Sequence, residues 1–206
     1  MLQAEDNTTR FVKHGFSVRP PNGWHVADTK IIQMFSMATH RGVVAHAKHR
    51  NPRIDPAVVE SEILLLATKH PLGAKEDNPN ITVSVEKSWN PTTHNSGTTY
   101  LGLLEERFKL FKAPSRLIGE PQKMEIVGVM FYMQDAVNNK VPDASTRQQY
   151  VTTYLDPYYL TFTISYNDKK DPDYLAMRAM IETFTTLPKN VQQGAVGQTA
   201  APPGSK

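Results

Sequence analysis

The segment from Phe16 to Trp24 constrains the fold more than any other part of the chain, because it joins a strand, a rigid turn and a large aromatic side chain. Phe16 and Val18 alternate with polar neighbours, which is the period-two pattern of a half-buried strand. Two prolines follow, and they fix the backbone φ angle and remove two backbone donors, so the strand must end there. An Asn-Gly pair then favours a turn, after which we expect Trp24 to anchor the chain in the core.

Composition is that of a globular protein with one domain. The chain has 206 residues, of which 39% are hydrophobic and 21% charged. The longest strictly apolar run covers only 63–67, far short of the ~20 residues that span a bilayer. The absence of cysteine excludes disulfides, thiolate nucleophiles and cysteine-bound metals. A net charge of +3 is too small to indicate a nucleic-acid partner.

The two ends of the chain lack any apolar period. We therefore expect a flexible segment over 1–9, a single domain over 10–187, and a disordered tail rich in proline, glycine, alanine and glutamine over 188–206.

The sequence predicts three helices, over 55–70, 98–112 and 171–187. The first begins with Asp55 as a good N-cap and Pro56 at the first helical position. In all three, apolar residues recur at intervals of three or four, as they do along the buried face of a helix.

Most of the remaining chain reads as strands. The predicted strands are 31–39 and 42–49 as one hairpin, 81–85, a long apolar segment over 125–134, and 148–155 with 158–166 as a second hairpin. In the last strand, aromatic and aliphatic residues alternate with mostly hydroxyl-bearing ones, so one face is buried and the other is polar. The fold class is therefore α+β, with a central antiparallel sheet of about six or seven strands sandwiched by about three helices.

At both ends of the predicted domain the chain resembles the PsbP-like superfamily, which includes the PsbP proteins of photosystem II and the Ran-binding Mog proteins. Phe16 to Trp24 is similar to the opening strand and its proline-glycine-tryptophan turn, and Tyr150 to Leu187 is similar to the closing hairpin and final helix. The resemblance implies an α/β/α sandwich and a binding or assembly role without catalysis. It carries no catalytic residues.

One stretch of the chain has a marked charge asymmetry. Between Thr29 and Ile54 there are five Lys or Arg residues, three histidines and no acid. On the predicted strand, Val43, Ala45 and Ala47 form the core face, which leaves His46, Lys48 and Arg50 on the opposite face. Together with Arg53 these residues form the predicted basic binding surface. The alternative is an edge strand that its charges keep soluble.

A second candidate contact region is the aromatic closing hairpin, at Tyr154, Tyr158 and Tyr159. Aromatic residues near methionines line ligand clefts and partner surfaces, although cross-strand core packing explains the same pattern.

Two further combinations of residues suggest chemistry only weakly. His40, His46 and His49 could bind a metal, but their spacing and the nearby cations argue against it, so no metal and no cofactor is expected. His94 stands beside hydroxyl groups, including that of Ser96, without the sequence context of a nucleophile, so we expect no catalytic residue there.

These observations predict a non-enzymatic binding or assembly module of the bacterial cell envelope or periplasm, with a leader removed. Its partner would be a protein or an anionic surface, without nucleic acid and without a transmembrane segment. One alternative is a cytoplasmic chaperone for a secreted effector. A different class of function is a small hydrolase using His94 and Ser96.

Overall fold

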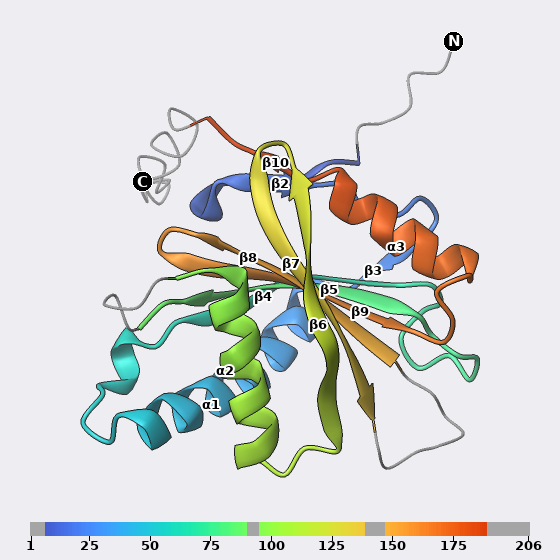
Figure 1. Ribbon diagram of the computed structural model, residues 1–206. Coiled ribbons are helices and arrows are strands. Elements are labelled where there is room, and N and C mark those ends of the chain that lie inside the picture. The colour runs from blue at the N-terminus through green and yellow to red at the C-terminus, as the bar shows by residue number, and fades with distance from the viewer. Residues whose placement is uncertain (1–6, 90–94, 139–146, 189–206) are drawn as a thin grey trace, which may run out of the picture.

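The computed structural model describes residues 7–89, 95–138 and 147–188 (Figure 1). The helices are α1 (Thr29–Arg50), α2 (Gly97–Leu110) and α3 (Pro172–Glu182), with short 3-10 turns η1 (Val12–His14) and η2 (Pro56–Val58). The strands are β1 (Thr9–Phe11), β2 (Phe16–Val18), β3 (His25–Val26), β4 (Ser61–Thr68), β5 (Asn80–Lys87), β6 (Ser115–Ile126), β7 (Val129–Asn138), β8 (Arg147–Leu155), β9 (Tyr158–Tyr166) and β10 (Thr185–Thr186). Residues 1–6 of the predicted flexible segment 1–9 and residues 189–206 of the predicted tail lie outside the described residues, and β1 begins at the last residue of the former.

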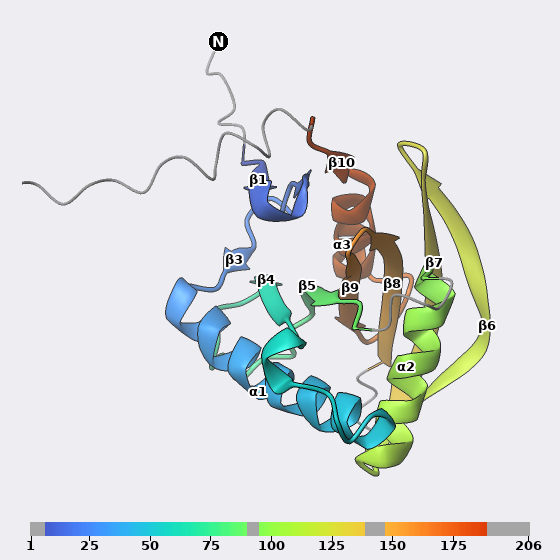
Figure 2. The same cartoon turned by 90° about the vertical axis from the view of Figure 1, so that its left-hand side faces the viewer.

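Seven of the strands form one antiparallel sheet, in the order β3-β4-β5-β9-β8-β7-β6. The other three form a small antiparallel sheet in the order β1-β2-β10, which brings the two ends of the described chain together. The large sheet is covered by α1 and α2 on one face, and by α3 and the small sheet on the other (Figure 2). The predicted α+β class, with its central antiparallel sheet and three helices, is confirmed.

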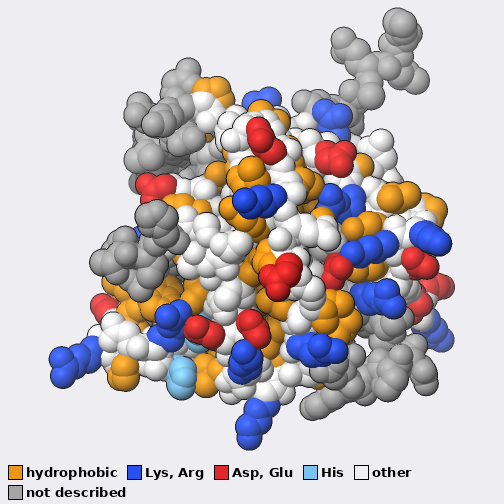
Figure 3. Space-filling view, in the orientation of Figure 1, with side chains coloured by type: hydrophobic (Ala, Val, Ile, Leu, Met, Phe, Trp, Pro, Cys, Tyr) orange, Lys and Arg blue, Asp and Glu red, His pale blue; other side chains and the backbone are white. Residues whose placement is uncertain are grey.

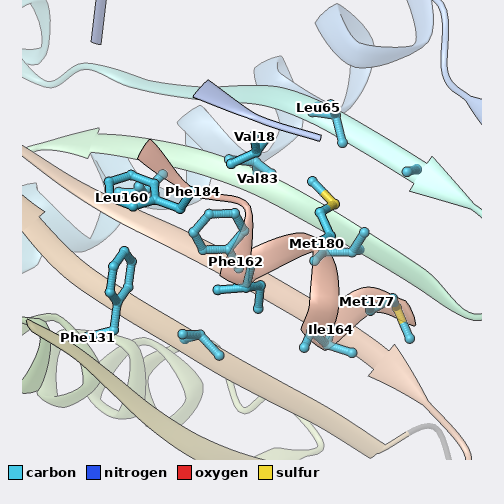
Figure 4. Close-up of a cluster of buried hydrophobic side chains, with 14 of the residues drawn as sticks. Val18, Leu65, Val83, Phe131, Leu160, Phe162, Ile164, Met177, Met180 and Phe184 are labelled. Carbon is cyan, nitrogen blue, oxygen red and sulfur yellow. The ribbon is translucent and has the colours of Figure 1, made fainter. Parts of the chain in front are cut away.

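The main hydrophobic core lies between the large sheet and the layer formed by α3 and the small sheet (Figure 4). Phe162 of β9, Phe131 of β7 and Phe184 after α3 are fully buried there, together with Met177 and Met180 of α3. Val18 of β2 joins this cluster, and Trp24 packs against it as a half-buried side chain. The opening strand and turn therefore fasten the N-terminal segment to the core.

The predicted hairpin over 31–39 and 42–49 is wrong, because this stretch forms the single helix α1. Asp28 caps the helix by accepting the N–H of Ile31 at 2.9 Å. Its buried residues Val43, His46 and Ala47 follow helical spacing. A helix that buries so few residues has a weak apolar period, and its alternating apolar residues near the C-terminal end resemble a strand.

The predicted helix over 55–70 is also wrong. Its capping signal starts only the 3-10 turn η2, where Asp55 accepts the N–H of Ala57 at 2.9 Å, and the apolar run belongs to β4. Leu65 packs in the main core, whereas Ile63 lies on the α1 side. A strand covered on both faces carries a continuous apolar run, which periodicity cannot distinguish from a buried helix.

The segment predicted as one strand over 125–134 consists of two. β6 and β7 form a long hairpin whose turn is Val127-Gly128, both with positive φ angles of 48° and 74°. Positive φ at both central residues is the geometry of a type I′ turn. Asn-Gly or Asp-Gly normally signals this turn, so a valine at its first central position hid it.

The remaining predicted elements are confirmed, except for the end of the last helix. Strand β5, helix α2 and the hairpin of β8 and β9 lie where the sequence placed them. Helix α3 begins as predicted but ends at Glu182, and the last part of the predicted helix instead forms β10, which pairs with β2. No helix among the described residues combines the length and apolar character needed to cross a membrane.

Gly97, at the first position of α2, sets how closely this helix approaches the sheet. A Cβ at this position would meet the backbone carbonyl oxygen of Thr152 and the ring of Tyr132. Gly97→Ala should therefore lower the free energy of unfolding by roughly 1–3 kcal/mol, through overpacking, in urea titrations followed by circular dichroism. Gly102→Ala in the same helix is the control, since a Cβ there meets nothing within 4 Å, and it should be neutral or stabilising. Equal effects of the two substitutions would contradict this account.

Candidate functional site

The two faces of the central strands differ in chemistry, and the candidate site lies on the polar face. On β5, Ile81, Val83 and Val85 point into the main core, so Thr82 and Ser84 face α1 and α2. On β9, Leu160, Phe162 and Ile164 are in the core, whereas Tyr159, Thr161 and Thr163 face the helices. Because these hydroxyls offer little hydrophobic attraction, the apolar contacts of α1 and α2 are confined to small clusters, and polar interactions add to them.

A buried ion pair joins α2 to β5. Glu86 and Arg107 are 3% and 8% exposed, and Arg107 donates from both terminal nitrogens to the two carboxylate oxygens, with Nη1 at 2.7 Å from Oε2. Burial alone would lower the pKa of Arg107, but the carboxylate of Glu86 reverses this effect and the pKa is raised. Both groups are therefore charged, and each satisfies the other in a region with little water.

His46 of α1 continues this network. Its Nδ1 accepts a hydrogen bond from Arg107 Nε at 3.0 Å, and its Nε2 lies 3.3 Å from Glu106 Oε2. Burial lowers the pKa of His46, and the positive charge of Arg107 lowers it further. The contacts fit the neutral tautomer with its proton on Nε2, which donates to Glu106.

At the surface the network ends at Arg50, the last residue of α1. Its guanidinium lies 3.3 Å from the same Glu106 oxygen and 5.7 Å from the centroid of the Trp89 ring. We call Glu86, Arg107, His46, Glu106 and Arg50 the charge chain. In it a neutral imidazole connects two ion pairs of opposite charges, and the chain fastens both helices to the sheet.

Two cavities flank α2. The larger, which we call the inter-helix cavity, has a volume of about 440 Å³ and lies between α1 and α2 over β5 and β9. The smaller, which we call the junction pocket, has about 190 Å³ and is lined by Arg50, Trp89, Glu106 and Tyr159, among others. The charge chain runs between them, with Arg107 lining the first and Glu106 the second.

The structure separates the four residues of the predicted basic surface. His46 is 1% exposed and belongs to the charge chain, so its assignment to a surface was wrong. Lys48, Arg50 and Arg53 are exposed at the end of α1 and just beyond it. Arg50 is engaged by Glu106 and Trp89, which leaves Lys48 and Arg53 as the members directed wholly to solvent.

The three hairpin tyrosines do not share one surface. Tyr154 and Tyr159 stack at 5.3 Å between ring centroids, and Tyr159 is buried with its hydroxyl donating to Asn95 at 2.5 Å. Tyr158 lies on the opposite face, where it contacts His14 edge-on and donates to Glu60 at 3.3 Å. Between the two predicted contact regions, the structure brings Arg50 and Tyr159 together, at the junction pocket.

The residues of the hydrolase alternative receive no support as a pair. His94 lies outside the described residues. Ser96 is the N-cap of α2, and its hydroxyl accepts the N–H of Thr99 at 3.2 Å. Among the described residues, no three His, Cys, Asp or Glu side chains meet in a way that could hold a metal ion.

Sequence reasoning missed Glu86 and Arg107, which are central to the site. Glu86 ends the clean alternation of β5 on its polar side, and Arg107 directly precedes Phe108 in the apolar stripe of α2. Each of these two elements carries one charged residue at an inward-facing position, and the two charges are opposite. This is the signal in the sequence that could have paired Glu86 with Arg107.

The sequence matches no protein-family model and no curated protein. Among solved structures, the chain is similar to the solution structure of cyanobacterial PsbP from Synechocystis sp. PCC 6803, with a TM-score of 0.53. The match covers 90% of this chain and 96% of that one, at 14% sequence identity. The fold of this chain is PsbP-like. The resemblance at Phe16–Trp24 and Tyr150–Leu187 is thereby confirmed as a resemblance of fold, and the function of this PsbP-like domain must be argued from its own side chains.

The buried ion pair gives a stability prediction for the PsbP-like domain. Arg107→Leu leaves Glu86 buried without a counter-charge, so the free energy of unfolding should fall by about 3–5 kcal/mol in urea titrations. Arg50→Leu at the exposed end of the charge chain is the control, and it should cost no more than about 1 kcal/mol. The double variant Glu86→Leu/Arg107→Leu should recover most of the loss. A double variant at least as unstable as Arg107→Leu would show that the ion pair does not act in this way.

The buried histidines make stability depend on pH. Burial lowers the pKa of His46 and of His14, and the charges of Arg107 and Lys13, respectively, add to the effect. The folded state then binds fewer protons than the unfolded state, whose histidines titrate near pH ~6.5. The stabilisation is therefore complete above that pH and lost progressively below it. Thermal melts between about pH 8 and pH 5 should show a smaller loss of stability in His46→Gln, with a remainder due to His14. Identical pH profiles of the two proteins would refute the role of His46.

Proposed function

We propose that this PsbP-like domain is a non-enzymatic binding or assembly module that captures an acidic protein partner on the outer face of α1. The observation that carries the proposal is how little of α1 is buried. The helix has 22 residues, but only Val43, His46 and Ala47 are buried, all in its C-terminal half. Helices in proteins owe most of their stability to a packed apolar face, so a long helix with a free outer face is suited to pack against a partner.

The exposed residues of α1 form a continuous line along the helix. We call this line the α1 stripe. Its residues follow one another at spacings of three or four, and they are Lys30, Met34, Met37, Arg41, Ala45 and Lys48. Met34 and Met37, at its centre, are 57% and 59% exposed. The stripe is about 27 Å long at 1.5 Å per residue, which matches one side of a partner helix.

Charge indicates the chemistry of this partner. Helix α1 contains no acid, and within the described chain Lys30, Arg41 and Lys48 form no ion pair. Lys and Arg side chains project from the lower rim of the molecule in Figure 3, where α1 and the C-terminal end of α2 lie in Figure 1. A segment with apolar residues against the two methionines and Asp or Glu on either side is complementary to this surface.

The spacing of the cations favours a protein over an anionic lipid surface. Arg41 is eleven residues from Lys30 and seven from Lys48, so the charges are spread along the helix. The large exposed apolar residues of α1 are two methionines and a single phenylalanine, Phe35. Interfacial helices that bind lipids carry dense cations and bulky apolar residues such as Trp, Phe and Leu.

We further propose the bacterial cell envelope or periplasm as the location of this domain. A cytoplasmic effector chaperone would use the same surface. Fractionation of the native host distinguishes the two locations.

Charge reversal of the stripe, combined with photo-crosslinking, tests the proposal. With p-benzoylphenylalanine in place of Met37, the protein should crosslink in its native host to an acidic segment of one partner. The triple variant Lys30→Glu/Arg41→Glu/Lys48→Glu should reduce the crosslinked product by roughly tenfold or more, because it replaces attraction by repulsion.

The matched control is Lys75→Glu/Lys123→Glu/Lys170→Glu, which makes the same change in net charge at exposed positions outside α1. It should leave the crosslink intact. A crosslinker at Leu175, which is 56% exposed on α3, reports background. Equal products from positions 37 and 175, or equal losses in both triple variants, would refute the α1 stripe as the contact surface.

A further inference from the structure

The inter-helix cavity has features of a ligand site that the capture of a protein on the outer face of α1 does not explain. Its volume of about 440 Å³ lies within the range of small-molecule pockets. It opens on the inner side of α1, whereas the α1 stripe lies on the outer side. The two surfaces can therefore be tested separately.

The floor of the cavity is a group of unused hydroxyls. Thr82 and Ser84 of β5 and Thr163 of β9 line it as half-buried side chains, and Thr82 stands opposite Thr163 in the ladder. Within the described chain, none of these three hydroxyls has a side-chain hydrogen-bond partner. By contrast, the neighbouring hydroxyl of Thr161 donates to Thr152 at 3.2 Å. A row of free donors and acceptors on adjacent strands suits a ligand with several polar groups along one edge.

One wall of the cavity is aromatic. Phe108 of α2 and Tyr150 of β8 lie 6.2 Å apart between ring centroids, and Phe111 continues the wall at the end of α2. Flat aromatic faces pack against the apolar faces of ring-shaped ligands, while the polar edges of such ligands remain free to reach the hydroxyl floor.

Gly42 keeps the opposite wall open. This glycine lies inside α1 and lines the cavity, and a Cβ at its position would meet nothing within 4 Å. Glycine inside a helix is destabilising, and the packing of this protein does not require it. Its effect is to leave free space beside Val43 at the side of the cavity.

The cavity has no net charge to offer a ligand. Among its lining residues, Arg107 is the one charged side chain, and Glu86 neutralises it through two hydrogen bonds. Tyr100, which also lines the cavity, stays neutral because burial raises the pKa of its phenol to about 12. A charged ligand would find no free counter-charge here.

We propose that the inter-helix cavity binds a neutral saccharide of one or two rings, held against Phe108 and Tyr150 and hydrogen-bonded to Thr82, Ser84 and Thr163. A sugar ring combines apolar C–H faces with a rim of hydroxyls, which matches an aromatic wall beside a hydroxyl floor. A fatty acid would leave the floor unsatisfied and bring an unpaired carboxylate, and a plain aromatic molecule would also leave the hydroxyls without partners.

Ligand-observed NMR and calorimetric titration of the full chain test this inference. The probes are glucose, galactose, mannose, N-acetylglucosamine, maltose, cellobiose, lactose and diacetylchitobiose, with octanoate and indole as comparisons. At least one saccharide should bind in the millimolar range or tighter, with saturation transfer to its ring C–H protons. Longer oligomers of that sugar show whether the natural ligand is part of a polysaccharide or a free sugar. The affinity should rise with oligomer length if the cavity binds a polysaccharide, and fall if it binds a free sugar.

Two variants tie binding to the cavity. Gly42→Leu fills the free space and Thr82→Val/Thr163→Val removes two hydroxyls at nearly constant shape, so each should weaken binding by roughly tenfold or more. Neither should lower the thermal midpoint, because leucine is a better helix former and valine a better strand former. Gly102→Leu, on α2 outside the cavity, and the triple charge reversal of the α1 stripe should leave saccharide affinity unchanged.

Three results would overturn the inference. They are the absence of binding by every saccharide, binding that is retained in Gly42→Leu, and an affinity for octanoate or indole above that for every saccharide. None of them bears on capture of a protein by the α1 stripe, whose test uses different residues.

Discussion

The buried pair of Glu86 and Arg107 is the interaction on which the helix side of the molecule depends. The central strands present hydroxyls to α1 and α2, so the apolar contacts of these helices lie in small separate clusters rather than in one layer like the one under α3. In addition, Arg107 connects Glu86 on the sheet with His46 on α1. A buried carboxylate and guanidinium are costly to remove from water, and they are stabilising only when each satisfies the other. The arrangement therefore fixes the position at which the C-terminal halves of α1 and α2 meet. Elsewhere Tyr100, Leu101 and Leu103 pack α2 against the sheet, whereas the N-terminal half of α1 has no buried residue.

Both candidate surfaces follow from the way α1 is attached. Near the charge chain its side chains Val43, His46 and Ala47 are buried, whereas farther toward its N-terminal end α1 contacts β4 through hydrogen bonds such as that from Ile63 N–H to the Ser36 hydroxyl, without a buried side chain. The gap on the inner side is the inter-helix cavity, with hydroxyls that the protein does not use. The uncovered outer side is the α1 stripe, with its two methionines among cations. A sheet with an apolar helix side would have closed the cavity and drawn more of α1 into the core.

The sequence predicted those elements whose local signals agree with their surroundings. Phe16–Trp24 and Tyr150–Leu187 combine clear alternation with turn and cap residues, and the structure confirms both. The sequence predicted strands over most of 29–50, which is helical, and a helix over 55–70, most of which is a strand. Both errors arise from how these elements are covered in the tertiary structure. Helix α1 is barely covered, so its apolar period is weak, and β4 is covered on both faces, so its apolar run is continuous. The site was predicted in part, since Arg50 was found, whereas Glu86 and Arg107 become neighbours only in three dimensions.

The unequal roles of the two faces also explain how a PsbP-like fold can persist at 14% identity to cyanobacterial PsbP. The layer beneath α3 requires apolar side chains of suitable volume, a condition that many sequences meet. Phe131, Phe162 and Phe184 meet it here with interlocking rings. The helix side combines smaller apolar clusters with one polar network. Substitutions that alter cavities and exposed stripes there cost little stability, so this is the side on which proteins of this fold can acquire different partners and ligands.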